Sequence, residues 1–205
     1  MPSSHELRAG DGMLLLDGRP FFPLQFRADE VEGVGWAEVA AIGFNCIRLK
    51  VFGAGHDHSV TTAAALPIPP PEELHGLKIC GYVWDRVILD DQKTHRAELT
   101  AAVQELCARE DVLSYEVYNE PAWRPDAPTA VTITPEQMAQ GFDLLKRLDG
   151  TGRPVHLGHS ASATVEALQS YNRVSDCVGC NPYPVFPKHW KLGERPDNQN
   201  RQDLA

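Results

Sequence analysis

The sequence predicts an α/β fold built on a parallel sheet. Six strand-like segments alternate with helix-like segments, as in a sheet with helical crossovers. Most of the strand-like segments are apolar without polar alternation, which is typical of parallel strands covered by helices. No glycine-rich phosphate motif follows the first strand, which disfavours a dinucleotide-binding fold. The remaining common solution is a TIM-type β/α barrel. Because such barrels usually need about 250 residues, a chain of 205 residues is expected to hold about six of the eight units.

Apolar and β-branched runs mark the expected strands. The first strand lies within residues 13–26, after a hairpin that turns at Asp17-Gly18. The others are expected at residues 44–52, 77–84, 111–120, 153–159 and 175–181. Pro121 ends the fourth of these strands, because proline cannot donate a hydrogen bond to a strand ladder.

Apolar residues at helical spacing mark the expected helices. A short helix begins at Trp36 and ends at Gly43, and a longer one covers residues 94–109. Thr134-Pro135-Glu136-Gln137 is a capping box that begins a third helix, and a weaker fourth helix covers residues 163–169. Between these elements, the glycine- and proline-rich residues 53–75 are expected to form a loop with a helical remnant at 72–74.

The chain is expected to form one domain over residues 1–205. The barrel motifs cover residues 13–186, and residues 187–205 are polar and poorly patterned. A net charge of −9 disfavours nucleic acid and anionic membranes as partners. No apolar run reaches the roughly 20 residues that span a bilayer, and no signal peptide is evident, so a cytoplasmic protein is expected.

No metal or cofactor is expected from the cysteines and histidines. Five scattered cysteines indicate reduced thiols. Cys177 and Cys180 have the spacing of a metal or redox pair, but no second pair accompanies them, and burial as small apolar residues is the better interpretation. His56 and His58 could be two metal ligands, yet a third ligand is not evident nearby.

The end of the fourth strand carries the strongest candidate for chemistry. Glu120 lies beside the amide of Asn119 and near the indole of Trp123. A carboxylate at the end of a buried strand with these neighbours suits chemistry on a polyol, although a charged residue at a solvated strand end is the simpler alternative. The other strands help to decide between these interpretations.

Four motifs in order resemble the catalytic barrel of the clan A retaining glycoside hydrolases, such as β-galactosidases, β-mannanases and cellulases. They are Asp17-Gly-Arg-Pro-Phe-Phe22, Gly43-Phe-Asn-Cys-Ile-Arg48, Asn119-Glu-Pro121 and Asp176-Cys-Val-Gly-Cys-Asn-Pro-Tyr183. The resemblance implies a β-glycosidase that takes an oligosaccharide or glycoside as substrate. It covers about residues 13–186.

The resemblance also implies roles for individual residues. Glu120 would be the general acid/base, and Asn119 would bind the sugar 2-hydroxyl. Arg48 would keep the nucleophile ionised, with a structural salt bridge inside the barrel as the alternative. Tyr183 would donate a hydrogen bond to the nucleophile, with core packing as the alternative.

Further residues could form the rim of the site. Trp84 and Trp123 offer flat faces for sugar rings, and packing at the barrel rim is the alternative for both. His159 and Asp85 end strands and could contact hydroxyl groups. Asp85 is also the best candidate within the chain for a substitute nucleophile, although carboxylates on adjacent strands are more expected to share a substrate contact or a proton.

The sequence departs from the resemblance at the nucleophile. The resemblance implies a glutamate on a seventh strand, and this chain ends before one; Glu194 has no strand around it. Two interpretations therefore stay open. The chain is a C-terminally truncated β-glycosidase that is inactive as it stands, or it is a non-catalytic carbohydrate-binding or interaction module. For the truncated β-glycosidase, exposed barrel edges predict marginal stability and self-association. The non-catalytic module is instead expected to be soluble and to fold cooperatively.

Overall fold

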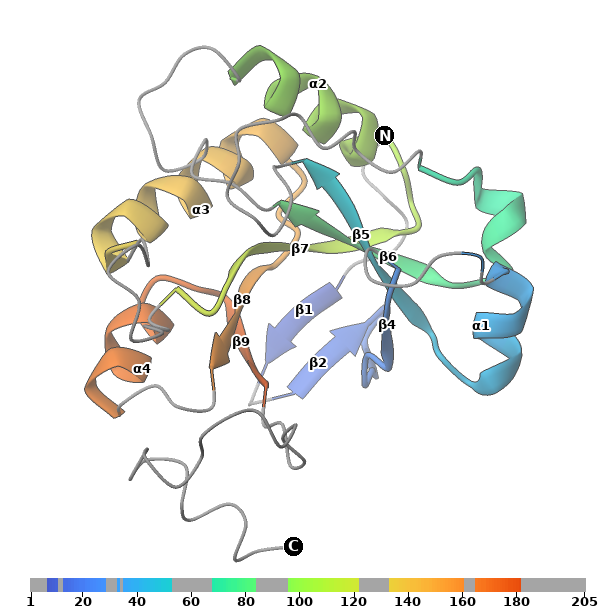
Figure 1. The fold of residues 1–205 in the computed structure, drawn as a ribbon, viewed down its shortest axis with the longest axis horizontal. Coiled ribbons are helices and arrows are strands. Elements are labelled where there is room, and N and C mark those ends of the chain that lie inside the picture. The colour runs from blue at the N-terminus through green and yellow to red at the C-terminus, as the bar shows by residue number, and fades with distance from the viewer. Residues whose placement is uncertain are drawn as a thin grey trace, which may run out of the picture.

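A six-stranded parallel sheet forms the centre of the computed structural model (Figure 1). The structure describes residues 7–10, 13–28, 33, 35–52, 68–83, 96–121, 133–160 and 165–181. The strands of the large sheet are β4 (Gln25–Arg27), β5 (Cys46–Phe52), β6 (Lys78–Val83), β7 (Val112–Asn119), β8 (Val155–Ser160) and β9 (Cys177–Asn181).

Each strand of this sheet lies beside its neighbour in the sequence, in the order β4-β5-β6-β7-β8-β9. A doubly wound sheet would reverse its strand order at a switch point. Consecutive parallel pairing with intervening helices is instead the topology of a β/α barrel. The prediction of an α/β fold with an incomplete TIM-type barrel is confirmed.

In the described residues, four helices and one 3₁₀ turn connect the strands: α1 (Trp36–Ile42), η1 (Pro71–Leu74), α2 (Arg96–Cys107), α3 (Pro135–Asp149) and α4 (Val165–Asn172). Figure 1 shows the four helices around the outside of the sheet. η1 is the expected helical remnant. Within the part of the chain that the structure describes, no helix is long and apolar enough to cross a membrane.

The helix ends confirm the predicted caps. Thr134 Oγ1 accepts a hydrogen bond from the Gln137 backbone N–H at 3.2 Å, and Gln137 Oε1 accepts one from the Thr134 N–H at 2.9 Å. This reciprocal pair satisfies two amides that α3 would otherwise leave unpaired. At the end of α1, Gly43 has a φ of 106°, a conformation that glycine adopts without steric cost.

A small antiparallel sheet precedes the barrel strands. It contains β1 (Leu7–Gly10), β2 (Met13–Leu16) and β3 (Arg19–Pro20) in that order. Asp17 and Gly18 both have positive φ, as the predicted two-residue hairpin turn requires. Apolar residues of this region pack against Cys46 and Leu113 near the N-terminal ends of β5 and β7. The small sheet therefore covers one end of the barrel interior.

The main core lies between the large sheet and the helices. Fully buried strand residues on this side include Ile47, Ile79, Val117 and Leu157. The helices contribute apolar side chains that are also inaccessible to solvent: Val103, Leu106, Met138 and Leu145. Each Leu or Ile buried in this way stabilises the fold by about 1.5–3 kcal/mol, so the helical layer is the main source of stability.

A buried ionic network joins α3 to the strands on either side of it. The Arg153 guanidinium donates to Asp149 Oδ1 at 2.6 Å and to the backbone carbonyls of Val112 at 2.7 Å and Arg109 at 2.6 Å. The Tyr115 hydroxyl donates to the same Asp149 oxygen at 2.8 Å. The Arg153 and Asp149 side chains are 6% and 3% exposed. The network thus fixes the start of β8 against α3 and the α2–β7 connection.

Acid should destabilise the fold through this network. Burial by itself would raise the pKa of the Asp149 carboxyl. Hydrogen bonds from Thr151 and Tyr115 and the charge of Arg153 outweigh burial, so the pKa of Asp149 lies below its usual value. A carboxyl with a lowered pKa in the folded state contributes stability that is present above its unfolded pKa of about 3.9 and is lost as pH falls through the folded pKa.

The check is urea unfolding as a function of pH. Between about pH 5 and the acid limit of folding, the free energy of unfolding should fall more steeply with decreasing pH in the wild type than in Asp149→Asn. Asp143→Asn, at an exposed position on α3, is the matched control and should follow the wild-type slope. Equal slopes for Asp149→Asn and the wild type would contradict the assignment.

The large sheet is open in the described residues. β4 pairs only with β5, and β9 pairs only with β8. Val178 on β9 keeps 46% of its surface exposed although it lies in a sheet strand. These features agree with the expectation of self-association through barrel edges, which stays a prediction.

Candidate active site

The candidate acid/base residue lies where active sites of β/α barrels are found. Asn119 is the last residue of β7 and Glu120 follows it, so both lie at the carboxyl end of a barrel strand. The Glu120 backbone N–H donates to the Gly158 carbonyl of β8 at 2.7 Å. Asn119 is paired with Gly158, and the register with β8 shifts between Glu116 and Asn119. This local irregularity changes the direction of the side chains at the strand end.

The backbone at this strand end is strained. Tyr118 and Glu120 have φ values of 55° and 58°, in the left-handed region that non-glycine residues seldom adopt. Each such residue costs on the order of 1–3 kcal/mol, and such strain is concentrated at functional sites. The Asn119 and Glu120 side chains are both partly exposed. The strain therefore presents an amide and a carboxylate side by side at the open end of the strand.

Glu120 has no second carboxylate beside it at the strand ends that the structure describes. Among these residues, it is the only carboxylate within one residue of the carboxyl end of a strand in the large sheet. The predicted site residues Trp84, Asp85, Trp123 and Tyr183 lie outside the described residues, as do His56, His58 and Glu194. Their roles stay predictions.

Arg48 lies deeper in the barrel than Glu120. Its Nη1 is 3.3 Å from Glu116 Oε1, and its guanidinium carbon is 4.1 Å from the centre of the Tyr82 ring. Arg48 is 2% exposed and Glu116 is 5% exposed. This arrangement is a buried ion pair with a cation–π contact. The sequence left open a structural salt bridge or a contact with the nucleophile. The structure gives Arg48 an ionic partner, and the contact with the nucleophile stays a prediction.

His159 has its partners on α4. Its Nε2 is 2.7 Å from Asn172 Oδ1, and its ring meets the Tyr171 ring edge to face at 6.2 Å. Because strand side chains alternate between faces, His159 is on the opposite face of β8 from His156. Burial lowers the pKa of His159, although the hydrogen bond with Asn172 opposes this. The expected contact with a sugar hydroxyl stays a prediction, and the position favours a role in packing α4.

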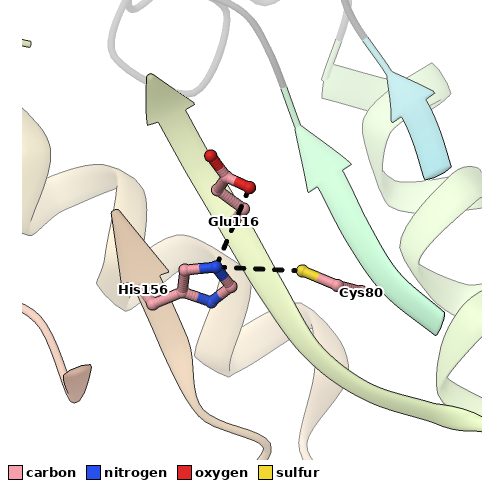
Figure 2. A group of neighbouring side chains, drawn as sticks. All are labelled: Cys80, Glu116 and His156. Atoms are coloured by element: carbon pink, nitrogen blue, oxygen red, sulfur yellow. Dashed lines mark hydrogen bonds and ion pairs between the residues drawn. The ribbon is translucent and has the colours of Figure 1, made fainter. Parts of the chain in front are cut away.

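A second group of polar side chains lies on the interior face of the sheet. Cys80, Glu116 and His156 come from β6, β7 and β8 and converge there (Figure 2). His156 Nε2 is 3.8 Å from Glu116 Oε2 and 3.9 Å from Cys80 Sγ. Burial lowers the pKa of His156, and the charge of Glu116 only partly opposes this. Burial also raises the pKa of the Cys80 thiol. Around neutral pH, Cys80 is therefore a thiol and the imidazole of His156 is neutral.

The sequence did not predict this group. Each member lies in the middle of an apolar run, where a single polar residue is easily assigned to the core. The available clue was the position of these residues on neighbouring strands. Glu116 has Tyr82 and His156 as its neighbours in register, and Cys80 is two residues before Tyr82 on the same strand face.

The fold is an incomplete TIM-type β/α barrel, and Glu120 lies at the carboxyl end of its fourth strand. No protein-family model matches the chain, and no curated protein sequence matches it. Solved structures do match, and several of them are bacterial β-glucuronidases.

The enzyme from Ruminococcus gnavus superposes with a TM-score of 0.58 at 16% identity, over 98% of this chain and 34% of the enzyme. The enzyme from Parabacteroides merdae, solved with glycerol in its active site, gives 0.55 at 15% identity, over 98% of this chain and 25% of the enzyme. β-Glucuronidase 3 from Bacteroides uniformis gives 0.54 at 15% identity, over 86% and 23%. The chain thus spans about a quarter to a third of the length of these enzymes. The resemblance to a glycosidase barrel is confirmed for the fold.

Proposed function

We propose that this chain carries the acid/base half of a retaining β-glycosidase active site. The observation that carries the proposal is the position of Glu120, which lies beside Asn119 on strained backbone at the carboxyl end of β7. The fold supports it, because several of the solved structures that match are those of β-glucuronidases.

In this mechanism two carboxyl groups about 5 Å apart act on opposite sides of the glycosidic bond. Glu120 protonates the departing oxygen while the second carboxylate attacks the anomeric carbon. Glu120 then removes a proton from the water that releases the sugar, and returns to its initial state. The side-chain amide of Asn119 binds the sugar 2-hydroxyl, a contact that strengthens in the transition state.

Under this proposal the second carboxylate is a glutamate on a seventh strand, and Glu194, the only glutamate after residue 181, has no strand pattern around it. We therefore expect the polypeptide of residues 1–205 to show no detectable hydrolysis of aryl β-glycosides on its own. Under this proposal, the chain still binds the sugar through the strand ends that it contains. The alternative function is a module that binds carbohydrate without turnover. Such a module would also bind the sugar, but Glu120 would donate no proton in it.

The substrate class is a β-linked glycoside. A net charge of −9 disfavours the approach of anionic sugars at long range, whereas the matching enzymes are β-glucuronidases. A panel should therefore include a β-glucuronide and the corresponding β-glucoside, which differ only at the carboxylate, together with a β-galactoside and a β-mannoside.

Binding to this panel tests the proposal through Asn119. Isothermal calorimetry should detect saturable binding of at least one glycoside to the wild type. Asn119→Ala should raise the Kd about fivefold to tenfold, since one hydrogen bond contributes about 1 kcal/mol. Gln104→Ala, at an exposed position on α2, is the matched control and should bind as the wild type does. Absence of saturable binding across the panel, or an unchanged Kd in Asn119→Ala, would contradict the proposal.

A further inference from the structure

We propose that Cys80, Glu116 and His156 form a binding site for a zinc ion on the interior face of the sheet. This site lies deeper in the barrel than Glu120, and its Glu116 contacts Arg48, which was predicted to belong to the glycosidase site. Glu116 precedes Glu120 by four residues on β7, which at about 3.3 Å per residue places it roughly 13 Å deeper along the strand.

The register of the sheet brings the three ligands together. Glu116 is directly opposite His156 of β8 and directly opposite Tyr82 of β6, and Cys80 shares the face of Tyr82. Figure 2 shows the three side chains directed toward one another from three adjacent strands. Because each ligand is anchored in a paired strand, the site requires no ordering of a loop.

The spacing suits a tetrahedral ion. Zinc lies about 2.3 Å from sulfur and about 2.0–2.2 Å from nitrogen or oxygen, so neighbouring ligand atoms are about 3.4–3.6 Å apart. The His156 Nε2 atom is 3.8 Å from Glu116 Oε2 and 3.9 Å from Cys80 Sγ, and no pair of ligand atoms exceeds 4.8 Å. Binding would shorten the two distances from His156 Nε2 by about 0.3–0.4 Å, and the distance between the Cys80 and Glu116 ligand atoms, which is at most 4.8 Å, by up to about 1.3 Å.

The ligand types also favour zinc. Thiolate, imidazole and carboxylate are the three side-chain groups that commonly bind this ion, and a thiolate disfavours magnesium or calcium. A separation of 3.8 Å between nitrogen and oxygen is too long for a hydrogen bond. The carboxylate and the imidazole therefore face each other at ion-pair distance, and the Cys80 sulfur is within hydrogen-bond distance of the same nitrogen. A zinc ion bound between the three atoms would replace both contacts.

Arg48 acts on the other side of the carboxylate. Its guanidinium contacts Oε1 of Glu116, so Oε2 is the oxygen that faces His156. A hydrogen-bonded partner of this kind orients a metal ligand, although its positive charge also lowers the affinity for a cation. The His156 side chain keeps 19% of its surface exposed, which gives an ion a path to the site. A bound ion would link β6, β7 and β8 across the interior.

Metal titration of the whole chain tests the site. The probe is Zn²⁺ alone, added to metal-free residues 1–205 and followed by calorimetry, with Co²⁺ as a spectroscopic substitute. The wild type should bind one equivalent of zinc and should show thiolate-to-cobalt charge-transfer absorption. Cys80→Ser should lose that absorption, and His156→Gln should lower the affinity at least about tenfold. Zinc should raise the Tm of the wild type and leave that of Cys80→Ser unchanged.

Cys107→Ser is the matched control, because the Cys107 thiol donates to a backbone carbonyl within α2, away from the interior face. This variant should keep the cobalt absorption. Circular dichroism establishes whether each variant is folded. A wild-type protein without saturable zinc binding, or without thiolate-to-cobalt absorption, would overturn the proposal. So would absorption that persists in folded Cys80→Ser.

Discussion

Replacing Glu120 with glutamine should slow formate-dependent cleavage of alkyl β-glycosides by this chain about 10²–10⁴-fold. Formate is a small carboxylate that can occupy the position of the second carboxyl group, attack the anomeric carbon and leave an unstable glycosyl formate. The departing oxygen still needs a proton, and Glu120 is the group proposed to supply it. Glutamine has nearly the same shape as glutamate and cannot donate that proton.

The leaving group provides an internal control for this experiment. A nitrophenolate departs without much protonation, whereas an alkoxide needs a full proton. The loss in Glu120→Gln should therefore be much larger for an alkyl β-glycoside than for the nitrophenyl β-glycoside of the same sugar. Product formation in the presence and absence of formate, measured by chromatography, gives both rates. Glu105→Gln, at an exposed position on α2, should behave as the wild type.

Two outcomes would contradict the proposed role. Formate-dependent cleavage that is equal in Glu120→Gln and the wild type would remove Glu120 from the mechanism. Robust cleavage without formate that disappears in Glu120→Gln would keep Glu120 as the acid/base but refute the inactivity of residues 1–205.

The elements of the barrel could be predicted because their patterns are local. The capping box at Thr134 and the left-handed end of α1 at Gly43 are contained in a few consecutive residues, and the structure has both. β1 was not predicted. Leu7–Gly10 is a four-residue segment, and its partner is the neighbouring β2. A strand of that length is defined by its pairing more than by its own composition.

The residues of the two polar groups also differ in whether a local sequence pattern reveals them. Asn119 and Glu120 are adjacent in the chain, so a local motif was enough to find them. Cys80, Glu116 and His156 are separated by 36 residues (116 − 80) and 40 residues (156 − 116), and only the register of three strands brings them together. The same register explains why the strands looked uniformly apolar. Their outer face supplies the core, and a few polar residues on the inner face bind one another.

Breaking the Arg153 network should cost more stability than breaking any exposed ion pair of the chain. We expect Arg153→Met to lower the free energy of unfolding by about 3–5 kcal/mol, which is typical when one partner of a buried pair is removed. Methionine fills much of the same volume but leaves the Asp149 carboxylate without its cation. It also leaves the Val112 and Arg109 carbonyls without their side-chain donor.

Lys146→Met is the matched control for this prediction. Lys146 Nζ is 2.6 Å from Asp176 Oδ1, but the two side chains are 44% and 32% exposed. An ion pair as exposed as this contributes about 0–1 kcal/mol, so the control should change the free energy of unfolding only slightly. Urea unfolding followed by circular dichroism measures both variants. Equal losses in the two would show that burial does not set the strength of the Arg153 network.

The double variant Arg153→Met/Asp149→Asn separates the two parts of the cost. If the charge left on Asp149 causes most of the loss, removing that charge should recover part of the stability, because the amide can still accept the hydrogen bond from the Tyr115 hydroxyl. If the loss of unfolding free energy in the double variant equals the sum of the losses in the two single variants, the contacts of Arg153 with the backbone carbonyls account for the loss. In that case Arg153 stabilises the barrel mainly by fixing the connection between α2 and β7.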